Sequence, residues 1–342
     1  MIEKTTSLEI NMEGCFLYYQ IERVLEQQSV EIENYYKGRG ILLCETKEGL
    51  FALKEFHGRA QKAEYLYDLG QYLNNAGIAC DFLVKNKDGE LLTEGVDGVS
   101  YSFHHWAKGR ECDVKNRMDI LMTVSLLAKL HCVETGDFLE MHPGLAGESL
   151  YHMYERHDRE LRRIRKYIGK RNNRSPFEQL FLKCYPEYVE QSQIVLQRLT
   201  EERMSLKEHT LGICHGDFNQ HNILLTGRDG TFLHMEHARV DAVVSDLSNF
   251  LRKILEKYDW NEELGVQMLT EYSRVCPLQP CDWRELYDRL SYPEKFWKIA
   301  NRYLQSNKVW DSGKNYEKLM KEIRSDSYRQ RFLRAFRARY LG

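Results

Sequence analysis

The stretch that decides the fold is HGDFNQHN, residues 215–222. Its aspartate, Asp217, is followed five residues later by Asn222, directly before an apolar run that predicts a strand. Phosphoryl transfer needs a carboxylate that orients an attacking hydroxyl, and it needs oxygen ligands for a Mg²⁺ ion that bridges the nucleotide phosphates. The spacing can place both groups at the mouth of one cleft and predicts a phosphotransferase loop. A plain polar loop between a helix and a strand is the alternative.

The run LFALKEF, residues 50–56, predicts a strand well upstream of this loop. Period-two alternation places Ala52 and Lys54 on the same face of that strand. A lysine on so apolar a strand is usually an edge residue in contact with water. The Ala-x-Lys ending is also that of the kinase β3 strand, where a small residue leaves room for adenine and the lysine holds phosphates.

Two features near this strand extend the nucleotide hypothesis. Gly38 and Gly40 indicate a permissive turn over the phosphates, and an ordinary strand turn competes with that interpretation. On the helix predicted after the strand, Glu64 is the expected partner of Lys54 and Asp68 is the alternative. A solvated helix face is an equal competitor for both acids.

The hydrophobic periodicity divides the chain into a sheet-like first third and a helical remainder. The first third predicts a hairpin of residues 41–46 and 50–56, a helix over 60–73, and strands over 81–85, 91–94 and 99–106. The remainder predicts helices over 114–133, 149–168, 176–205, 246–258, 262–275, 283–304 and 315–341, interrupted by a hairpin of residues 222–226 and 231–236. We therefore expect an α+β fold with a small antiparallel N-lobe, residues 1–106, and a larger helical C-lobe, residues 107–342.

Composition narrows the classes of protein. The 342 residues carry 49 Lys and Arg against 51 Asp and Glu, a balance that argues against a nucleic-acid binder. No apolar run approaches the roughly 18 residues of a membrane span, and residues 1–7 lack the apolar stretch of a secretory signal. The nine cysteines are odd in number and form no CxxC pair, which is typical of reduced thiols rather than of disulfides or zinc. These features predict a cytoplasmic protein.

Taken in chain order, these motifs resemble those of aminoglycoside-phosphotransferase and choline-kinase-like enzymes. The order is Ala52-x-Lys54, LAKLH at residues 127–131, the 215–222 octet, and Asp246-Leu247. Within that superfamily, SYPEKFWKIANRYLQS at residues 291–306 and FLRK at residues 250–253 are similar to the CotS-type spore-coat kinases of endospore-forming bacteria.

The resemblance implies a protein-kinase-like bilobal fold that binds ATP with Mg²⁺. Asp217 would be the catalytic carboxylate, Asn222 a Mg²⁺ ligand, and Lys54 a contact of the phosphates. Residues 101–105 would form the hinge that reads adenine. The acceptor would be the hydroxyl of a small molecule that the sequence does not identify. Localisation would be on the mother-cell side, with incorporation into the spore coat and other coat proteins as partners.

One departure from the family pattern bears on catalysis. Where the family carries the first Asp of an Asp-x-Asp/Glu element, its main Mg²⁺ ligand, this chain reads His234-Met235-Glu236. Imidazole suits zinc or copper better than Mg²⁺ and brings no negative charge, so metal–nucleotide binding should weaken. If Glu236 shares a strand face with Phe232 and His234, its carboxylate could substitute; His234 could instead bind a softer metal with Asn222. The remaining alternative is a catalytically impaired pseudokinase that serves as a coat scaffold.

The C-terminal segment, residues 324–339, has six arginines and one acid. Phe332, Phe336 and Tyr340 fall at helical spacing and form an apolar stripe, which predicts an amphipathic basic helix. Packing of this stripe on the C-lobe, with a solvated basic face, is the ordinary interpretation. Docking to an acidic partner and contact with a membrane surface are the alternatives.

Overall fold

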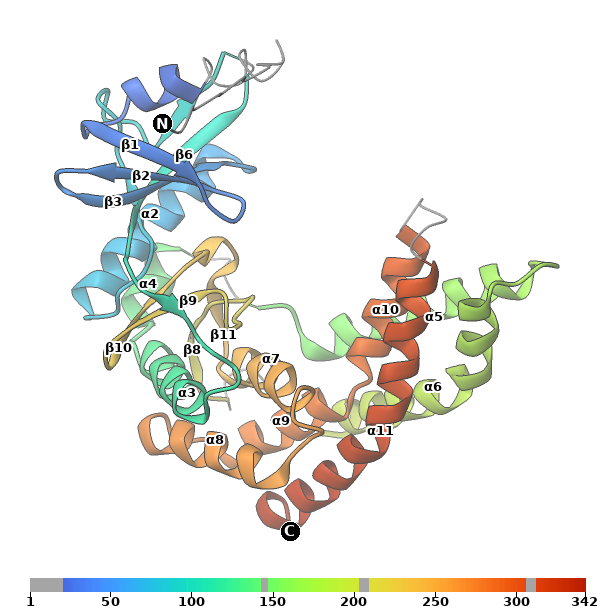
Figure 1. The fold of residues 1–342 in the computed structure, drawn as a ribbon. Coiled ribbons are helices and arrows are strands. Elements are labelled where there is room, and N and C mark those ends of the chain that lie inside the picture. The colour runs from blue at the N-terminus through green and yellow to red at the C-terminus, as the bar shows by residue number, and fades with distance from the viewer. Residues whose placement is uncertain (1–20, 97, 143–146, 203–208, 306–311) are drawn as a thin grey trace, which may run out of the picture. The chain divides into compact units, whose positions relative to one another are not determined.

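The structure is a computed structural model, and it describes the chain except for residues 1–20, 97, 143–146, 203–208 and 306–311 (Figure 1). The described residues belong to two compact units. The first unit runs to Glu111 and also takes in His221–Glu236, while the second comprises Cys112–Gln220 and His237–Gly342. The chain thus returns to the first unit for one hairpin, which the boundary expected near residue 106 had assigned to the C-lobe.

The first unit is built on an antiparallel sheet of strand order β1-β2-β3-β6-β4, in which β5 also pairs with β6. Its strands are β1 (Ile32–Lys37), β2 (Leu42–Thr46), β3 (Gly49–Glu55), β4 (Leu83–Val84), β5 (Leu92–Glu94) and β6 (Ser100–Trp106). Helix α2 (Ala60–Asn75) follows β3 and buries Ala63, Leu66 and Leu69 at helical spacing. The predicted hairpin, helix and later strands are confirmed, and β1 was not anticipated.

A second, three-stranded sheet of order β10-β9-β7 completes this unit. It consists of β7 (Arg110–Glu111), β9 (Ile223–Thr226) and β10 (Asp229–Phe232). The predicted hairpin is therefore present, but its second strand ends at Phe232 instead of Glu236. His234 has a φ of 63°, a left-handed backbone that ends the ladder, and Met235–His237 form a 3₁₀ turn. The expectation that His234 and Glu236 share a strand face is wrong for this reason.

The second unit is mostly helical. Its helices are α3 (Arg117–His131), α4 (Gly136–Met141), α5 (Leu150–Gly169), α6 (Pro176–Glu202), α7 (Val244–Leu255), α8 (Glu262–Val275), α9 (Pro280–Ser291), α10 (Glu294–Gln305) and α11 (Ser312–Tyr340). Two short strands, β8 (Leu211–Cys214) and β11 (Arg239–Ala242), pair antiparallel, and the sequence analysis missed both. The helix predicted over 283–304 is in fact two, because Tyr292 is extended and Pro293 cannot continue the α9 ladder.

Aromatic side chains form much of the core between α5, α6, α10 and α11 in the second unit. Helices α5, α6, α10 and α11 share one core, in which Phe181 of α6 stacks on Phe296 of α10 with ring centroids 5.2 Å apart. The predicted stripe of α11 also packs inward, since Phe332 and Phe336 are each only 3% exposed. Among the described helices, none combines the length and the apolar character that a membrane crossing requires.

Candidate active site

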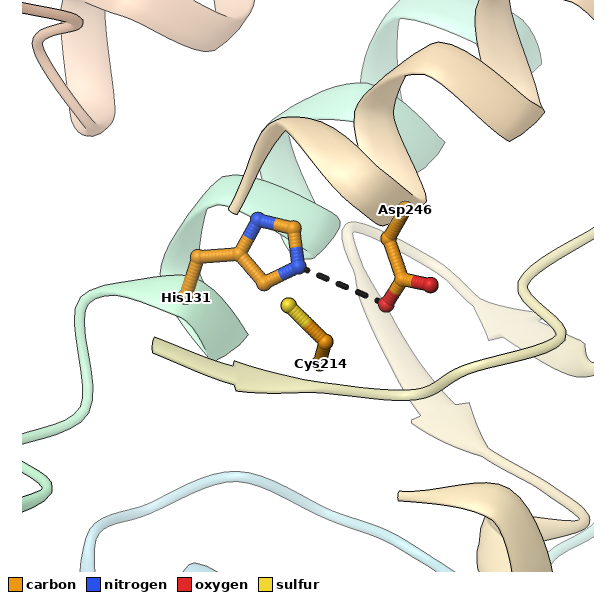
Figure 2. A group of neighbouring side chains, drawn as sticks. All are labelled: His131, Cys214 and Asp246. Carbon is orange, nitrogen blue, oxygen red and sulfur yellow. Dashed lines mark ion pairs between the residues drawn. The ribbon is translucent and has the colours of Figure 1, made fainter. Parts of the chain in front are cut away.

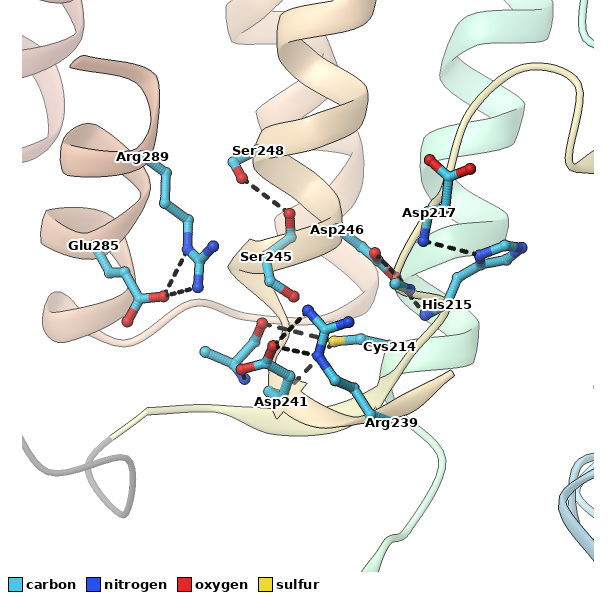
Figure 3. Close-up of polar contacts among 12 residues, drawn as sticks. Cys214, His215, Asp217, Arg239, Asp241, Ser245, Asp246, Ser248, Glu285 and Arg289 are labelled. Atoms are coloured by element: carbon cyan, nitrogen blue, oxygen red, sulfur yellow. Dashed lines mark hydrogen bonds and ion pairs between the residues drawn. The ribbon is translucent and has the colours of Figure 1, made fainter. Parts of the chain in front are cut away.

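The backbone of the predicted catalytic loop is held by hydrogen bonds to one buried acid, Asp246, in the first turn of α7. The loop leaves β8 at Cys214, and its first two peptide N–H groups, those of His215 and Gly216, both donate to the Asp246 carboxylate; the Gly216 bond is 3.0 Å long (Figure 3). Gly216 has a φ of +83°, and a Cβ there would lie 2.2 Å from the carbonyl oxygen of His237. The Gly of the HGD motif is therefore required by both conformation and space.

Asp246 keeps its negative charge although no part of it is exposed. Burial alone would raise the pKa of this carboxyl, but His131 and the His215 N–H outweigh burial and hold the pKa below its ordinary value. The imidazole of His131 on α3 lies 3.5 Å from the carboxylate and is also 2.6 Å from the hydroxyl of Tyr272. The 127–131 motif thus serves the loop from the neighbouring helix.

His131, Cys214 and Asp246 bring three potential metal-ligating atoms within 4.8 Å of one another (Figure 2). Both carboxylate oxygens of Asp246 already accept peptide N–H groups of the loop. Burial raises the pKa of the Cys214 thiol well above its ordinary value, so that the thiolate a metal needs is disfavoured. The group is therefore a structural support of the loop and not a metal centre.

Asp217, the predicted catalytic carboxylate, projects from this rigid loop. Its side chain is 58% exposed, and its peptide N–H donates to Nδ1 of His215 at 3.2 Å. The ammonium group of Lys253 on α7 donates to Oδ1 of Asp217 at 3.3 Å and to the carbonyl of Phe218 at 3.4 Å. Burial lowers the pKa of Lys253 in spite of this acid. From the sequence, Lys253 is noticeable only as part of the FLRK motif, and its contact with Asp217 was not predicted.

Lys54, the predicted phosphate contact, is buried on β3 between two acids of the same unit. Its ammonium group makes a short hydrogen bond to Asp81 and a 2.9 Å bond to Oε1 of Glu236. Burial opposes its charge, but the two carboxylates prevail and raise the pKa of Lys54 above its ordinary value. The predicted partner Glu64 lies exposed on α2. The expectation that Glu64 pairs with Lys54 is therefore corrected, and the alternative Asp68 is exposed as well.

Asp81 is the residue of this site that the sequence analysis did not assign. Its side chain is 1% exposed, and its peptide N–H donates to the carbonyl of Phe232 at 2.8 Å, which ties it to the β9–β10 hairpin. Its carboxylate also lies 3.8 Å from Nδ1 of His104. Burial and the nearby Lys54 charge lower the pKa of His104 well below its ordinary value. The available sequence signal for Asp81 was a single acid at the start of the strand predicted over residues 81–85.

The three predicted metal ligands all lie in the first unit. His234 packs edge-on against Trp106, and its Nδ1 is 3.9 Å from Oε1 of Glu236. Asn222 is 8% exposed, and its carbonyl accepts the N–H of Leu233 at 3.0 Å, which sets it beside His234 in the chain fold. The Lys54 charge outweighs burial and lowers the pKa of Glu236, which is therefore ionised. Asn222 and Glu236 offer the oxygen donors that Mg²⁺ prefers, whereas His234 does not.

The remaining predicted nucleotide residues surround the β1–β2 turn and the middle of the sheet. Gly38 donates to the carbonyl of Ile41 at 2.8 Å, and Gly40 has a φ of +73°, so both shape this turn. Ala52 is fully buried in an apolar cluster with Trp106 and Leu224. Residues 101–105 lie inside β6, where their register pairs them with β3, so their backbone does not form a hinge. Lys54 and Asp217 belong to different units, and their convergence stays a prediction.

Comparison with known proteins identifies a family. Residues 22–336 match the family model described as "Spore coat putative kinase YutH". The endospore coat-associated protein YutH of Bacillus subtilis (strain 168) is 26% identical over 151 residues, which are 41% of this chain and 41% of that protein. The aligned region thus spans less than half the length of this relative. The predicted resemblance to spore-coat kinase-like proteins is confirmed.

Solved structures identify the fold. An aminoglycoside phosphotransferase from Alicyclobacillus acidocaldarius superposes with a TM-score of 0.79 at 18% identity, covering 93% of this chain and 96% of that one. A spectinomycin phosphotransferase in complex with ADP and spectinomycin gives a TM-score of 0.66 at 12% identity, with 90% and 98% covered. At these identities the likeness concerns the fold alone. The predicted α+β, protein-kinase-like fold is confirmed.

Proposed function

The chain belongs to the YutH family of spore-coat kinase-like proteins, and on this premise we propose that it is an ATP-dependent phosphotransferase acting on a hydroxyl group of a small molecule. The observation that supports this most directly is the exposure of the Asp217 side chain on a fixed loop. Its carboxylate is exposed, contacts a lysine, and stands on a loop whose backbone is fixed by a buried acid. A side chain placed in this way can orient a hydroxyl and accept its proton.

Each predicted site residue has a role in this proposal. Asp217 orients the acceptor hydroxyl, and Lys54 holds phosphate oxygens after exchanging part of its contact with Glu236. Gly38 and Gly40 let the β1–β2 turn approach the phosphates, while Ala52 leaves room beside the base. Bound Mg²⁺–ATP supplies the phosphoryl group and the positive charge that offsets its oxygens. Asn222 and Glu236 would hold the cation.

The charges around Lys54 should make nucleotide binding weaker than in a site that keeps an Asp at the position of His234. One ammonium group faces the carboxylates of Asp81 and Glu236, so the local balance is negative before any phosphate arrives. His234 brings no carboxylate for the metal that would reverse this balance. We expect ATP to bind only together with a divalent cation, because the cation must neutralise both the phosphates and Glu236.

A second candidate function, a catalytically impaired pseudokinase that serves as a scaffold in the spore coat, is favoured by two of these observations. The imidazole at the main metal position and the occupied ammonium group of Lys54 both act against nucleotide binding. In that role the protein would bind other coat proteins after synthesis in the mother cell. The two functions share a fold and differ in turnover, because the pseudokinase would bind partners or nucleotide without transferring phosphate.

Thermal unfolding and an assay of turnover together separate the two functions. The melting temperature is measured for the full chain with ATP alone, with MgCl₂ alone and with both, since a ligand that binds the folded state at 100 times its Kd adds about 2.7 kcal/mol of stability. Stabilisation that requires both components supports the phosphotransferase, and ADP release is then assayed with amino alcohols and amino sugars as acceptors. No response to nucleotide at millimolar concentrations contradicts the phosphotransferase and supports the scaffold.

A further inference from the structure

Helix α5, at the far end of the second unit from β8 and β11 in Figure 1, has two chemically opposite faces. Its inner face buries Leu161, Ile164 and Ile168 in the core shared with α6, α10 and α11. On the outer face, Arg156, Arg159, Arg163 and Lys166 recur at i, i+3, i+7 and i+10, and all four are exposed. At about 1.5 Å of rise per residue they form a straight positive stripe about 15 Å long.

Nearby acids compensate the charge of the stripe only in part. Of the acids of α5, Asp158 is buried while Glu155 and Glu160 are only half-exposed, and Glu160 accepts the indole N–H of Trp297 at 2.7 Å. Within the described part of the chain, Arg156 pairs with Glu148, whereas Arg159, Arg163 and Lys166 have no ion pair. Exposed Arg162 and Arg165 flank the stripe, and exposed Lys170, Arg171 and Arg174 follow it, of which Arg171 pairs with Glu178 at 3.1 Å.

The basic face of α5 contrasts with the formal net charge of the whole chain, which is −2. Like charges at i, i+3 and i+4 repel and weaken a helix, so the arrangement costs stability when nothing binds to it. We propose that the outer face of α5 is a docking surface for an acidic polypeptide segment with carboxylates at matching helical spacing. Such a segment places its acids at intervals of about 4.5 to 6 Å, the intervals between successive bases of the stripe.

The same face is poorly suited to the other large anions. Interfacial helices anchor in a membrane through large apolar side chains, and the stripe has none between its bases; Tyr167, 49% exposed, is the large hydrophobic residue beside it. A long nucleic acid interacts with the charge of the whole molecule, and the formal net charge of the chain is −2. A short acidic segment lies within about one Debye length, roughly 8 Å, of the stripe, so the charges of the stripe dominate its interaction with the protein.

The test measures binding to the full chain of a fluorescein-labelled 20-residue peptide that carries four glutamates at i, i+3, i+7 and i+10. A matched peptide with glutamine at those positions is the ligand control. The variant R159Q/R163Q/K166Q removes three charges from the stripe. The variant R331Q/R334Q/R337Q removes three exposed charges from α11 and is the protein control. All substituted side chains are exposed, and unchanged melting temperatures verify folding.

We expect fluorescence anisotropy at 150 mM NaCl to show binding of the acidic peptide, a Kd about tenfold higher for the α5 variant, and little change for the α11 variant. Equal losses in both variants, or no binding to the parent, overturn the proposal. Tighter α5-dependent binding of a 20-nucleotide single strand, or of vesicles with anionic lipid, identifies a different class of partner and also overturns it. So does α5-dependent self-association of the protein without peptide binding, measured by sedimentation.

Discussion

The ammonium group of Lys253 lies 3.3 Å from the carboxylate of Asp217. Lys253 is on α7, and the first turn of this helix carries Asp246, the acid that supports the loop of Asp217. Helix α7 therefore contributes two charges to the predicted catalytic loop: Asp246 holds its backbone, and Lys253 contacts its exposed carboxylate. Both contacts come from this one helix, so the position of α7 determines the geometry of the loop. This arrangement makes Lys253 a positioning residue for Asp217 in the proposed reaction.

The first prediction concerns this lysine. Because Lys253 orients Asp217, Lys253→Gln should lower kcat about tenfold with little change in the KM for ATP. Burial lowers the pKa of Lys253, so the parent should lose the contact on the alkaline side at a lower pH than an ordinary lysine would. Lys253→Arg keeps its charge there, and its alkaline limb should move to higher pH. A pH–rate profile checks this, and identical limbs in parent and arginine variant would contradict it.

The second prediction uses two glycines that share a left-handed backbone. Gly216→Ala should cost about 3 kcal/mol or more, because its methyl group would meet the His237 carbonyl oxygen in addition to the backbone strain. Gly227 has a φ of +62°, and a Cβ added there would meet nothing within 4 Å, so Gly227→Ala should cost only about 1 kcal/mol. Urea unfolding of the two variants gives the comparison. Equal losses of stability would show that space at Gly216 is not limiting.

Much of the fold could be predicted from the sequence, because periodicity is a local property. The β2–β3 hairpin and the long helices follow from residues that lie within a few positions of one another. The α9–α10 break was missed because the apolar stripe continues across Pro293, although the backbone does not. Strands β8 and β11 have four residues each, like β9 and β10, but they pair across more than twenty intervening residues and no turn signal joins them.

The partners of the candidate site residues could not be predicted in the same way. Lys54 could pair with an acid close to it in sequence, such as Glu64, or with an acid that the fold brings near. Asp81 is 27 residues away and Glu236 is 182 residues away, and both contacts depend on where the sheet and the returning hairpin meet. The conformation of His234 depends likewise on a turn that interrupts an apparent strand. Motif spacing identified the residues, and tertiary packing determined their contacts.

The third prediction tests the burial of Lys54 against Asp81. Lys54→Met should destabilise the first unit by about 3 to 5 kcal/mol, because it leaves a carboxylate that is 1% exposed without its cation. Asp81→Asn should cost less, because Lys54 keeps its 2.9 Å ion pair with Glu236. The double variant removes both charges, so its loss should be clearly smaller than the sum of the two. Chemical denaturation of the four proteins completes this cycle, and additive losses would show that the pair is not coupled.

The fourth prediction concerns acid stability. The pKa of Glu236 is below its ordinary value in the folded protein, so its contribution to stability is present above the unfolded pKa, near 4.3, and is lost as the pH falls through the folded pKa. Glu236→Gln removes this titration. We expect the variant to lose less stability than the parent between about pH 5 and pH 3. Parallel melting temperatures of the two proteins across that range would contradict the ion pair with Lys54.

The fifth prediction asks whether the metal position can be restored. His234 has a left-handed backbone, which Asp and Asn also adopt readily, so His234→Asp and His234→Asn should both fold. Only the aspartate adds a hard, charged oxygen ligand beside Asn222 and Glu236. Stabilisation by ATP with Mg²⁺ should therefore increase in His234→Asp and stay at the parent level in His234→Asn. Equal gains in both variants would show that imidazole blocks the nucleotide by its size, and no gain in either would mean that these residues do not form the metal site.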